Sequence, residues 1–410
     1  MPSSLTSSLP FSPAELAYLH TSLSSTPPIR PDARPSPTDF RALRAETGVL
    51  PSVNGSAHVG FSDGREAIVG VKLEVERTFS VEVRASTSTS TSAGLQAKSI
   101  MKAKGGDKTR GEGGAGAGAG NDGEATDVDV DVDMNPNDSP RGQKGRGSHE
   151  WVTLSLTLPG LRDDDAGLVF LEEMLREPLV VASSSSRASL QDSLVINSRW
   201  HWHVYIDVLL ISATGLASYP LPLLSMATHL ALRDTRVPRL KSEGEEDPVA
   251  DDDWMASAYL YSRTGTETGI PVASRPPVTL LVVVVGENVI FDPSREELAV
   301  ADAVVAVSVG VASGGEGGRG ARGAEFEVLA TRMIDTPARD TMKGVPLLGE
   351  VGEGVEVPGI WKPRVGGIKR SMLKKAVNTA LTGGVARDVM DGLDGFLDLE
   401  TKAAVGAGAG

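Results

Sequence analysis

The sequence of 410 residues contains no cysteine, and only 4% of its residues are aromatic. The absence of cysteine excludes disulfide bonds, thiol catalysis and cysteine-based zinc sites, and it leaves the redox compartment open. No apolar run reaches the roughly 18 residues that a membrane span requires. The first residues also lack the basic start and apolar core of a secretory signal, so we expect a soluble intracellular protein that does not contact a membrane.

Basic residues are also fewer than acidic ones: the sequence has 40 basic and 54 acidic residues, and its formal net charge is -14. This balance argues against a protein whose whole surface grips nucleic acid, although a local basic groove is compatible with it. About a quarter of the chain has a composition that is unfit to fold, so we expect one large domain or two small lobes.

The part that is unfit to fold lies mainly at residues 86–150. It contains a Ser/Thr repeat, a basic block, a Gly-Ala repeat and alternating aspartates at 127–133. Such a segment buries too little apolar surface to offset its chain entropy, so we predict a long disordered insertion. The aspartates lack the glycine and bidentate glutamate of a calcium loop. The basic block could act as a nuclear import signal or attract RNA, but a solvated linker is the favoured interpretation.

The rest of the chain is organised around residues 199–240. Residues 203–211 are rich in Val, Ile and Leu, which predicts a strand buried on both faces. From Pro220 onward, apolar residues recur at spacings of three and four, which predicts a helix that ends by Pro238. A buried strand that leads into a buried helix is typical of a domain in which helices pack on a sheet.

Local signals mark several other elements. Ser12 and Glu15 form a capping box at the start of a short helix. Asp63-Gly64 predicts a hairpin turn between two apolar-rich strands, and a second hairpin is expected at 278–292. Residues 39–46 are compatible with a helix, and 295–299 are expected to form a polar link.

The predicted domains are an N-terminal helix and arm (1–37), a main domain (38–310) interrupted by the insertion at 86–150, an irregular Gly-rich insertion (311–366), and a C-terminal helix and tail (367–410).

Three segments of the sequence are distinctive when taken together and in order. Residues 29–34 read Ile-Arg-Pro-Asp-Ala-Arg, residues 231–238 read Ala-Leu-Arg-Asp-Thr-Arg-Val-Pro, and residues 290–297 read Ile-Phe-Asp-Pro-Ser-Arg-Glu-Glu. They resemble, in turn, the R-x-D-G-R arm, the "AL..TRIP" helix end and the "VDPT..EE" segment of the ribonuclease PH superfamily, and in particular of the ring subunits of the eukaryotic RNA exosome. Residues 39–41, 54–59, 69–74 and 205–210 match further family segments in the same order.

The resemblance implies a ribonuclease PH-like α/β fold with helices layered on sheets in two βαβα lobes of the ribosomal protein S5 domain 2 type. It also implies a place in a six-membered ring through which RNA is threaded. The expected partners are other ribonuclease PH-like ring subunits, RNA-binding cap subunits and RNA, and the expected locations are the nucleus, the nucleolus and the cytoplasm.

Two parts of the active family site are missing from the sequence. Active relatives hold the attacking phosphate with a Gly-Gly-Thr-Arg segment at a helix N-terminus, whereas the matching residues 213–217 contain no arginine. Active relatives also carry two acids six residues apart, and the matching positions are Ile290 and Glu296. We therefore predict no catalytic residues and no cofactor, and hence a non-catalytic structural subunit. The alternatives are a phosphate-dependent 3′-to-5′ exoribonuclease whose site is shared with a neighbouring subunit, and a free-standing RNA-binding adaptor.

Arg199, Arg34 and Arg41 are the candidate RNA contacts, and an ordinary surface ion pair is the alternative for each of them. His201 and His203 lie two residues apart on a strand and so face the same side, which is one arrangement of metal ligands. No third ligand is evident in the sequence, so packing is favoured and no metal site is predicted. Asp207 is expected to be a hydrogen-bonded residue of the core.

Overall fold

The structure is a computed structural model of the chain. Most of the predicted insertion at 86–150, the segment 213–217 and the Gly-rich loop at 313–323 lie outside the described residues. Among the helices that are described, none combines the length and apolarity needed to cross a bilayer. The described residues are 11–78, 147–181, 189–211, 219–261, 263, 275–312, 326–334 and 367–407.

The first sheet has five strands in the order β1-β2-β3-β5-β4. All neighbours are antiparallel except β4 and β5, which run parallel and are connected through helix α2. Gly64 has φ +84 in the β2–β3 turn, which confirms the hairpin predicted from Asp63-Gly64. The strands are β1 (Leu43–Thr47), β2 (Gly55–Phe61), β3 (Glu66–Arg77), β4 (Val152–Thr157) and β5 (Trp200–Leu210).

The expected helical character of residues 39–46 is wrong, because Leu43–Thr47 forms edge strand β1. It pairs with β2 in antiparallel register, from Leu43 opposite Phe61 to Thr47 opposite Ala57. Its residues alternate between half-buried and exposed. Pairing with a strand farther along the chain therefore overrides a weak local helix preference.

The second sheet has four antiparallel strands in the order β11-β10-β8-β9. The predicted hairpin at 278–292 is confirmed, with Gly286 at φ +61 in its turn. The expected polar link at 295–299 is instead helix α5 (Arg295–Ala299), which begins with a capping box between Ser294 and Glu297. The strands are β8 (Val278–Val285), β9 (Asn288–Phe291), β10 (Ala303–Val311) and β11 (Phe326–Ile334).

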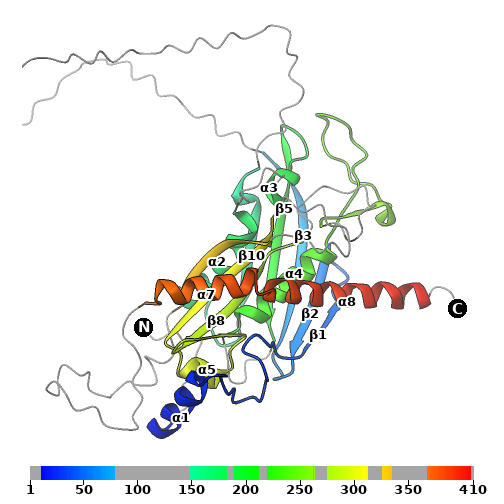
Figure 1. Cartoon of the computed structure of the whole chain (residues 1–410). Helices are drawn as coiled ribbons and strands as arrows, with labels where there is room; N and C mark the ends of the chain where they lie inside the picture. Colours follow the sequence, from blue (N-terminus) through cyan, green and yellow to red (C-terminus); the bar gives the residue numbers. More distant parts are fainter. Residues whose placement is uncertain are drawn as a thin grey trace, which may run out of the picture. The chain divides into compact units, whose positions relative to one another are not determined.

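Two helices lie between the sheets. Helices α2 (Ala166–Val180) and α4 (Leu221–Asp234) contact each other and strands of both sheets, and Figure 1 shows α4 between the strands of the two. Residues 221–233 of α4 are all buried, which confirms the central buried helix. The first sheet is thus covered by helices on one face, whereas strands β8 and β10 of the second sheet are buried almost throughout on both faces and further helices contact that sheet. Helices layered on sheets are expected for an α/β fold.

Strand β5 differs from the prediction in one respect. Trp202, Val204 and Ile206 point into the core, but the alternate positions reach the other face of the sheet, where Asp207 and Leu209 are exposed. The prediction of a strand buried on both faces, with Asp207 as a core residue, is therefore wrong. The helices cover only one face of this sheet, so every second residue of β5 points away from them.

The C-terminal part is more ordered than the predicted helix and tail. Helix α7 (Arg370–Leu381) is followed, after a turn in which Gly384 has φ +86, by a second helix, α8 (Val385–Ala407), and Figure 1 shows them one after the other. Met390 and Leu393 of α8 are buried. The helical spacing of these residues was overlooked in the predicted tail. Strand β11 was not predicted either, although it lies inside the insertion 311–366, because a partly exposed edge strand has little hydrophobic signal.

The remaining elements are short or peripheral. Helix α1 begins at the predicted capping box, in which the backbone N–H of Glu15 donates to Ser12 and the backbone N–H of Ser12 donates to Glu15. Its side chains Leu16 and Leu23 are buried. These elements are α1 (Pro13–Ser24), α3 (Leu190–Ser193), β6 (Arg236–Val237), β7 (Ala258–Tyr259), and the two 3-10 turns at His149–Trp151 and Trp254–Ala256.

Candidate functional site

The arm that follows α1 is held against the second sheet by arginine side chains. Arg30 donates through Nε and Nη2 to the two carboxylate oxygens of Glu297, at 2.8 and 2.9 Å. Both side chains are completely buried. The same guanidinium donates to the carbonyls of Phe291 and Asp292, so one arginine joins the arm to the end of β9 and to α5.

Arg34 and Arg41, two of the candidate RNA contacts, converge on one buried carboxylate. The Nη1 atom of Arg34 lies 3.1 Å from Oδ2 of Asp292, and Nε of Arg41 lies 2.9 Å from the same oxygen. Asp292 has no exposed side-chain surface and a φ of 46, a left-handed conformation that aspartate tolerates better than most residues. Arg41 also donates to Asp63 at 2.7 Å and lies 4.5 Å above the ring of Phe61.

These contacts indicate that Arg34 and Arg41 stabilise the fold by neutralising the buried carboxylate of Asp292. Their side chains are only 11% and 8% exposed, and both bind carboxylates. Arg199, the third candidate, lies just before β5 with a side chain that is 58% exposed and 3.5 Å from Asp247. The geometry therefore leaves Arg199 as the candidate with the most accessible guanidinium, and contact with RNA remains a prediction for all three.

The positions that match the acid pair of active relatives do not form a pair of acids. Ile290 is fully buried in β9, and Glu296 lies in the first turn of α5. The nearby carboxylates Asp292 and Glu297 are buried and bound to the arm's arginines. Helix α4 begins at Leu221, and the residue before it, Pro220, offers no side-chain cap. Residues 213–217, which match the phosphate cradle, lie outside the described residues.

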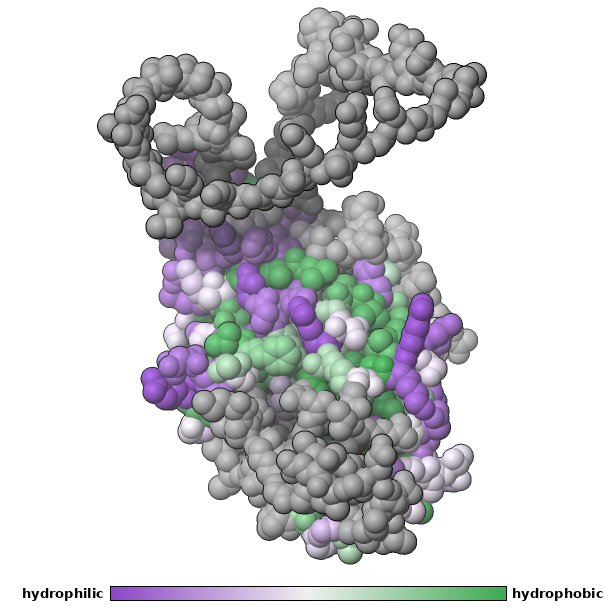
Figure 2. All heavy atoms as spheres, turned by 90° about the vertical axis from the view of Figure 1, so that its left-hand side faces the viewer, coloured by the Kyte–Doolittle hydropathy of each residue, from purple (hydrophilic) through white to green (hydrophobic). Residues whose placement is uncertain are grey.

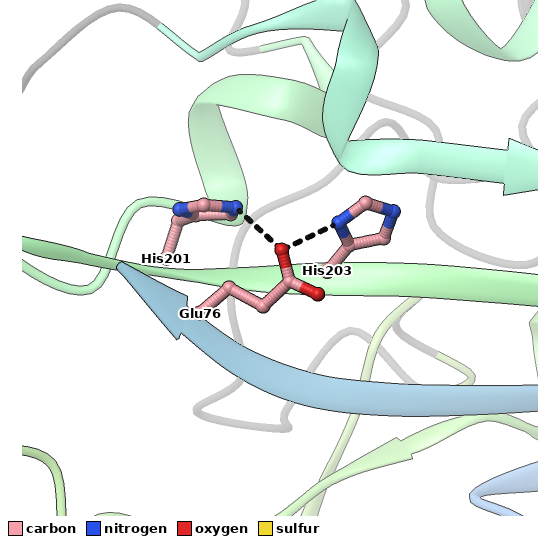
Figure 3. Close-up of side chains that lie close together, drawn as sticks. All are labelled: Glu76, His201 and His203. Carbon is pink, nitrogen blue, oxygen red and sulfur yellow. Dashed lines mark hydrogen bonds and ion pairs between the residues drawn. The ribbon is translucent and has the colours of Figure 1, made fainter. Parts of the chain in front are cut away.

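A further cluster forms on the outer face of the first sheet, where β3 ends and β5 begins. Glu76 on β3 stands opposite His201 on β5, with His203 two residues farther along. Figure 3 shows both imidazoles directed at the same carboxylate oxygen, Oε2 of Glu76. Nδ1 of His203 lies 3.1 Å from that oxygen, and Nε2 of His201 lies 3.9 Å from it. The two histidines are recognisable from their spacing on one strand, whereas no local signal in the sequence indicates the glutamate opposite them.

The surroundings of the cluster set its charges. Tyr205 donates to Glu76 at 2.6 Å, and this hydrogen bond is the main reason that the pKa of Glu76 is lowered and that of Tyr205 is raised to about 12. Burial lowers the pKa of His201, and the attraction of Glu76 offsets this only in part. At neutral pH the cluster therefore combines an ionised carboxylate with a neutral imidazole at His201.

The chain is similar in sequence to two curated proteins. It is 27% identical over 295 residues to exosome complex component RRP42 of Saccharomyces cerevisiae, and the match spans 72% of this chain and 80% of that protein. It is 24% identical over 299 residues to exosome complex component rrp42 of Schizosaccharomyces pombe, and this match spans 72% of this chain and 77% of that protein. The chain thus resembles RRP42 along most of the length of both proteins.

Two solved structures are similar to this one at low sequence identity. A chain of an archaeal exosome core aligns with a TM-score of 0.46 at 15% identity, covering 92% of this chain and 96% of that chain. A chain of the Archaeoglobus fulgidus exosome with RNA bound to the active site aligns with a TM-score of 0.40 at 17% identity, covering 80% of this chain and 91% of that chain. No family model matches the sequence.

Proposed function

We propose that this chain, which resembles exosome complex component RRP42, is a non-catalytic structural subunit of the RNA exosome core ring. Its role is to complete the channel through which RNA is threaded for 3′-to-5′ processing and degradation, including ribosomal RNA maturation and messenger RNA turnover. The observation that carries this proposal is the sequence similarity to the two RRP42 proteins, which extends over 72% of the chain.

The absence of catalysis is supported by the buried apolar residue in the acid-pair position. Ile290 has no exposed surface and lies in β9, two residues before Asp292, whose carboxylate is already bound by two arginines. A general acid or a metal ligand needs an oxygen that can reach the reacting group, and an isoleucine side chain has none.

A subunit role is supported by apolar side chains that reach the surface. Figure 2 shows hydrophobic residues gathered near the middle of one face, bordered by hydrophilic ones. Apolar surface of this kind commonly marks contacts between proteins. Large apolar side chains that are at least 40% exposed include Tyr18, Ile29, Val169, Phe170, Met255 and Met333.

The acidic net charge is compatible with an RNA path, because only the wall of the channel needs positive charge. Arg199 is our candidate for that wall, since its guanidinium is the most accessible of the three arginines. The cap subunits, the other ring subunits and RNA are the proposed partners, and the nucleus, nucleolus and cytoplasm are the proposed locations.

Native affinity purification of the tagged full-length chain tests the proposal. We expect equimolar ring subunits together with RNA-binding cap subunits, and a tagged chain that follows their distribution by microscopy. Recovery of the chain alone as a monomer would overturn the ring assignment and would favour a free-standing RNA-binding adaptor.

An assay of the reconstituted ring separates the structural role from a shared active site. We expect no RNA trimming that depends on inorganic phosphate, either by this chain alone or by the chain paired with its ring neighbours. If the pair did trim RNA with phosphate, and Arg199→Glu abolished this activity, the exoribonuclease alternative would replace the structural one.

A further inference from the structure

The buried imidazole of His201 has one nitrogen that the fold leaves without a hydrogen bond. The side chain is 4% exposed, and Nδ1 lies 3.0 Å from the hydroxyl of Thr78. Its Nε2 has no hydrogen-bond partner among the described residues, and the nearest acid oxygen, Oε2 of Glu76, is 3.9 Å away. A buried polar atom without a partner is rare in proteins, and an ion that completes its coordination is one explanation.

We propose that Glu76, His201 and His203 bind a divalent transition-metal ion of the Zn²⁺ class. The candidate ligand atoms of the three residues all lie within 4.8 Å of one another. With bonds of about 2.1 Å, two ligands of a tetrahedral Zn²⁺ are separated by about 3.4 Å. The distances from Oε2 of Glu76 to Nδ1 of His203 and to Nε2 of His201 are 3.1 and 3.9 Å, on either side of this value. Glu76 is 39% exposed, so its side chain has room to adjust.

The second ring nitrogen of each histidine already has the partner that a metal-bound histidine requires. Nδ1 of His201 can donate its proton to the Thr78 hydroxyl, which leaves the lone pair of Nε2 for the metal. Nδ1 of His203 faces Oε2 of Glu76 at 3.1 Å, and metal binding would replace this hydrogen bond. Nε2 of His203 lies 2.9 Å from the hydroxyl of Thr153, so Nε2 can carry the ring proton once Nδ1 binds the metal. Such outer hydrogen bonds select the tautomer and orient the ring.

The rings and the carboxylate are also held in place by their other neighbours. Trp151 stacks on His201 with ring centroids 4.1 Å apart, and Tyr205 stacks on His203 at 4.2 Å. The Tyr205 hydroxyl donates to Oε1 of Glu76, which leaves Oε2 directed at the histidines. The two rings are therefore held in place and Glu76 is turned toward them, so that binding requires only an adjustment of the Glu76 side chain.

The donor set selects the class of ion. Two imidazole nitrogens with one carboxylate suit Zn²⁺ and its first-row neighbours, whereas Mg²⁺ and Ca²⁺ prefer oxygen ligands. Three protein ligands leave a fourth tetrahedral position for water. A bound ion would join the end of β3 to the start of β5, at the point where the chain leaves β3 for the segment that begins at residue 79.

Titration of the metal-free full-length chain with Zn²⁺ by calorimetry tests the site. We expect one ion per chain and an increase in Tm that Mg²⁺ does not produce. Glu76→Gln retains the shape of the side chain and should weaken Zn²⁺ binding by at least about tenfold, as should His203→Gln. Thr78→Val, which removes only the partner of His201 Nδ1, should weaken it by about tenfold, the lower end of the range for such outer contacts.

The matched control is His58→Gln. His58 also faces a glutamate, with Nε2 3.2 Å from Oε2 of Glu66, but no third histidine or acid completes a ligand group around this pair among the described residues. Its removal should leave the Zn²⁺ affinity and the Tm shift unchanged. Equal Zn²⁺ binding by the wild-type chain and Glu76→Gln, or an equal loss in His58→Gln, would show adventitious binding and overturn the proposal.

Discussion

Arg30 and Glu297 are 267 residues apart in the sequence and form a two-point ion pair in which neither side chain has any exposed surface. Glu297 serves a second purpose, because its Oε2 accepts the backbone N–H of Ser294 at the start of α5. The pair therefore joins the N-terminal arm to the helix that follows β9. Because both charges are shielded from water, each depends on the other for stabilisation.

Arg30→Met should lower the free energy of unfolding by about 3–5 kcal/mol, because it leaves the carboxylate of Glu297 buried with Arg34, 3.8 Å away, as its one remaining ion-pair partner in the part of the chain that the structure describes. Urea denaturation measures the loss. The control is Arg162→Met, which breaks the Arg162–Asp164 pair, whose side chains are 86% and 72% exposed. It should leave the midpoint unchanged, and an equal loss in both variants would contradict the prediction.

Gly55→Ala should destabilise the chain by about 1–3 kcal/mol, because overpacking displaces backbone that cannot move freely. A Cβ on Gly55 would lie 2.4 Å from both the backbone N and Cα of Thr235, the residue that ends α4. The matched variant is Gly392→Ala in α8, where the added Cβ would meet no described atom within 4 Å apart from the adjacent residues and the backbone of the helix itself. It should stabilise the helix by about 0.5–1 kcal/mol, so thermal melts of the two variants should shift in opposite directions.

His229 should make the chain less stable as the pH falls below about 6.5. It is buried in α4, and burial, with Arg233 as a second cause, lowers its pKa to about 3. Above pH 6.5 the ring is neutral in the folded and unfolded states and adds no pH dependence. Between about 6.5 and 3 only the unfolded state takes up the proton, so the free energy of unfolding falls by about 1.4 kcal/mol per pH unit.

The comparison with His229→Gln isolates this contribution, because other titrating groups act equally in both proteins. Denaturant midpoints at pH 7.0, 5.5 and 4.5 should show a steeper decline for the wild-type chain, by about 1.4 kcal/mol between the last two values. Parallel curves for the two proteins would show that His229 is protonated in the folded state or is accessible to solvent.

Arg199→Glu should reduce RNA crosslinking to this subunit in the assembled ring without a change in its thermal stability. The side chain is 58% exposed and its ion pair with Asp247 is on the surface, where such pairs contribute little to stability. Arg162→Glu serves as the control for charge reversal at another exposed arginine. Unchanged crosslinking in Arg199→Glu would remove Arg199 from the RNA path.

Several elements followed from the sequence because their signals are local. The capping box of Ser12 and Glu15, the Gly64 turn and the buried periodicity of residues 221–233 each depend on neighbours within a few positions. Predictions were wrong where a long-range partner decided the outcome. Residues 43–47 became a strand by pairing with β2, and Asp207 lies exposed because the helices cover only one face of β5.

By itself the sequence determined the α/β class, the two hairpins and the resemblance to exosome ring subunits, and it has Ile290 where that resemblance implies an acid. Only the tertiary structure decided that Arg34 and Arg41 bind Asp292, and that Glu76 faces His201 and His203. The hydrogen bond from His203 to Glu76 joins residues 127 positions apart, and the antiparallel register of β3 and β5 brings them together. The hydrophobic alternation of each strand decides which side chains share a face. Because β3 and β5 are not joined by a hairpin turn that would fix their register, the pairing of Glu76 with the histidines is decided only when the sheet assembles.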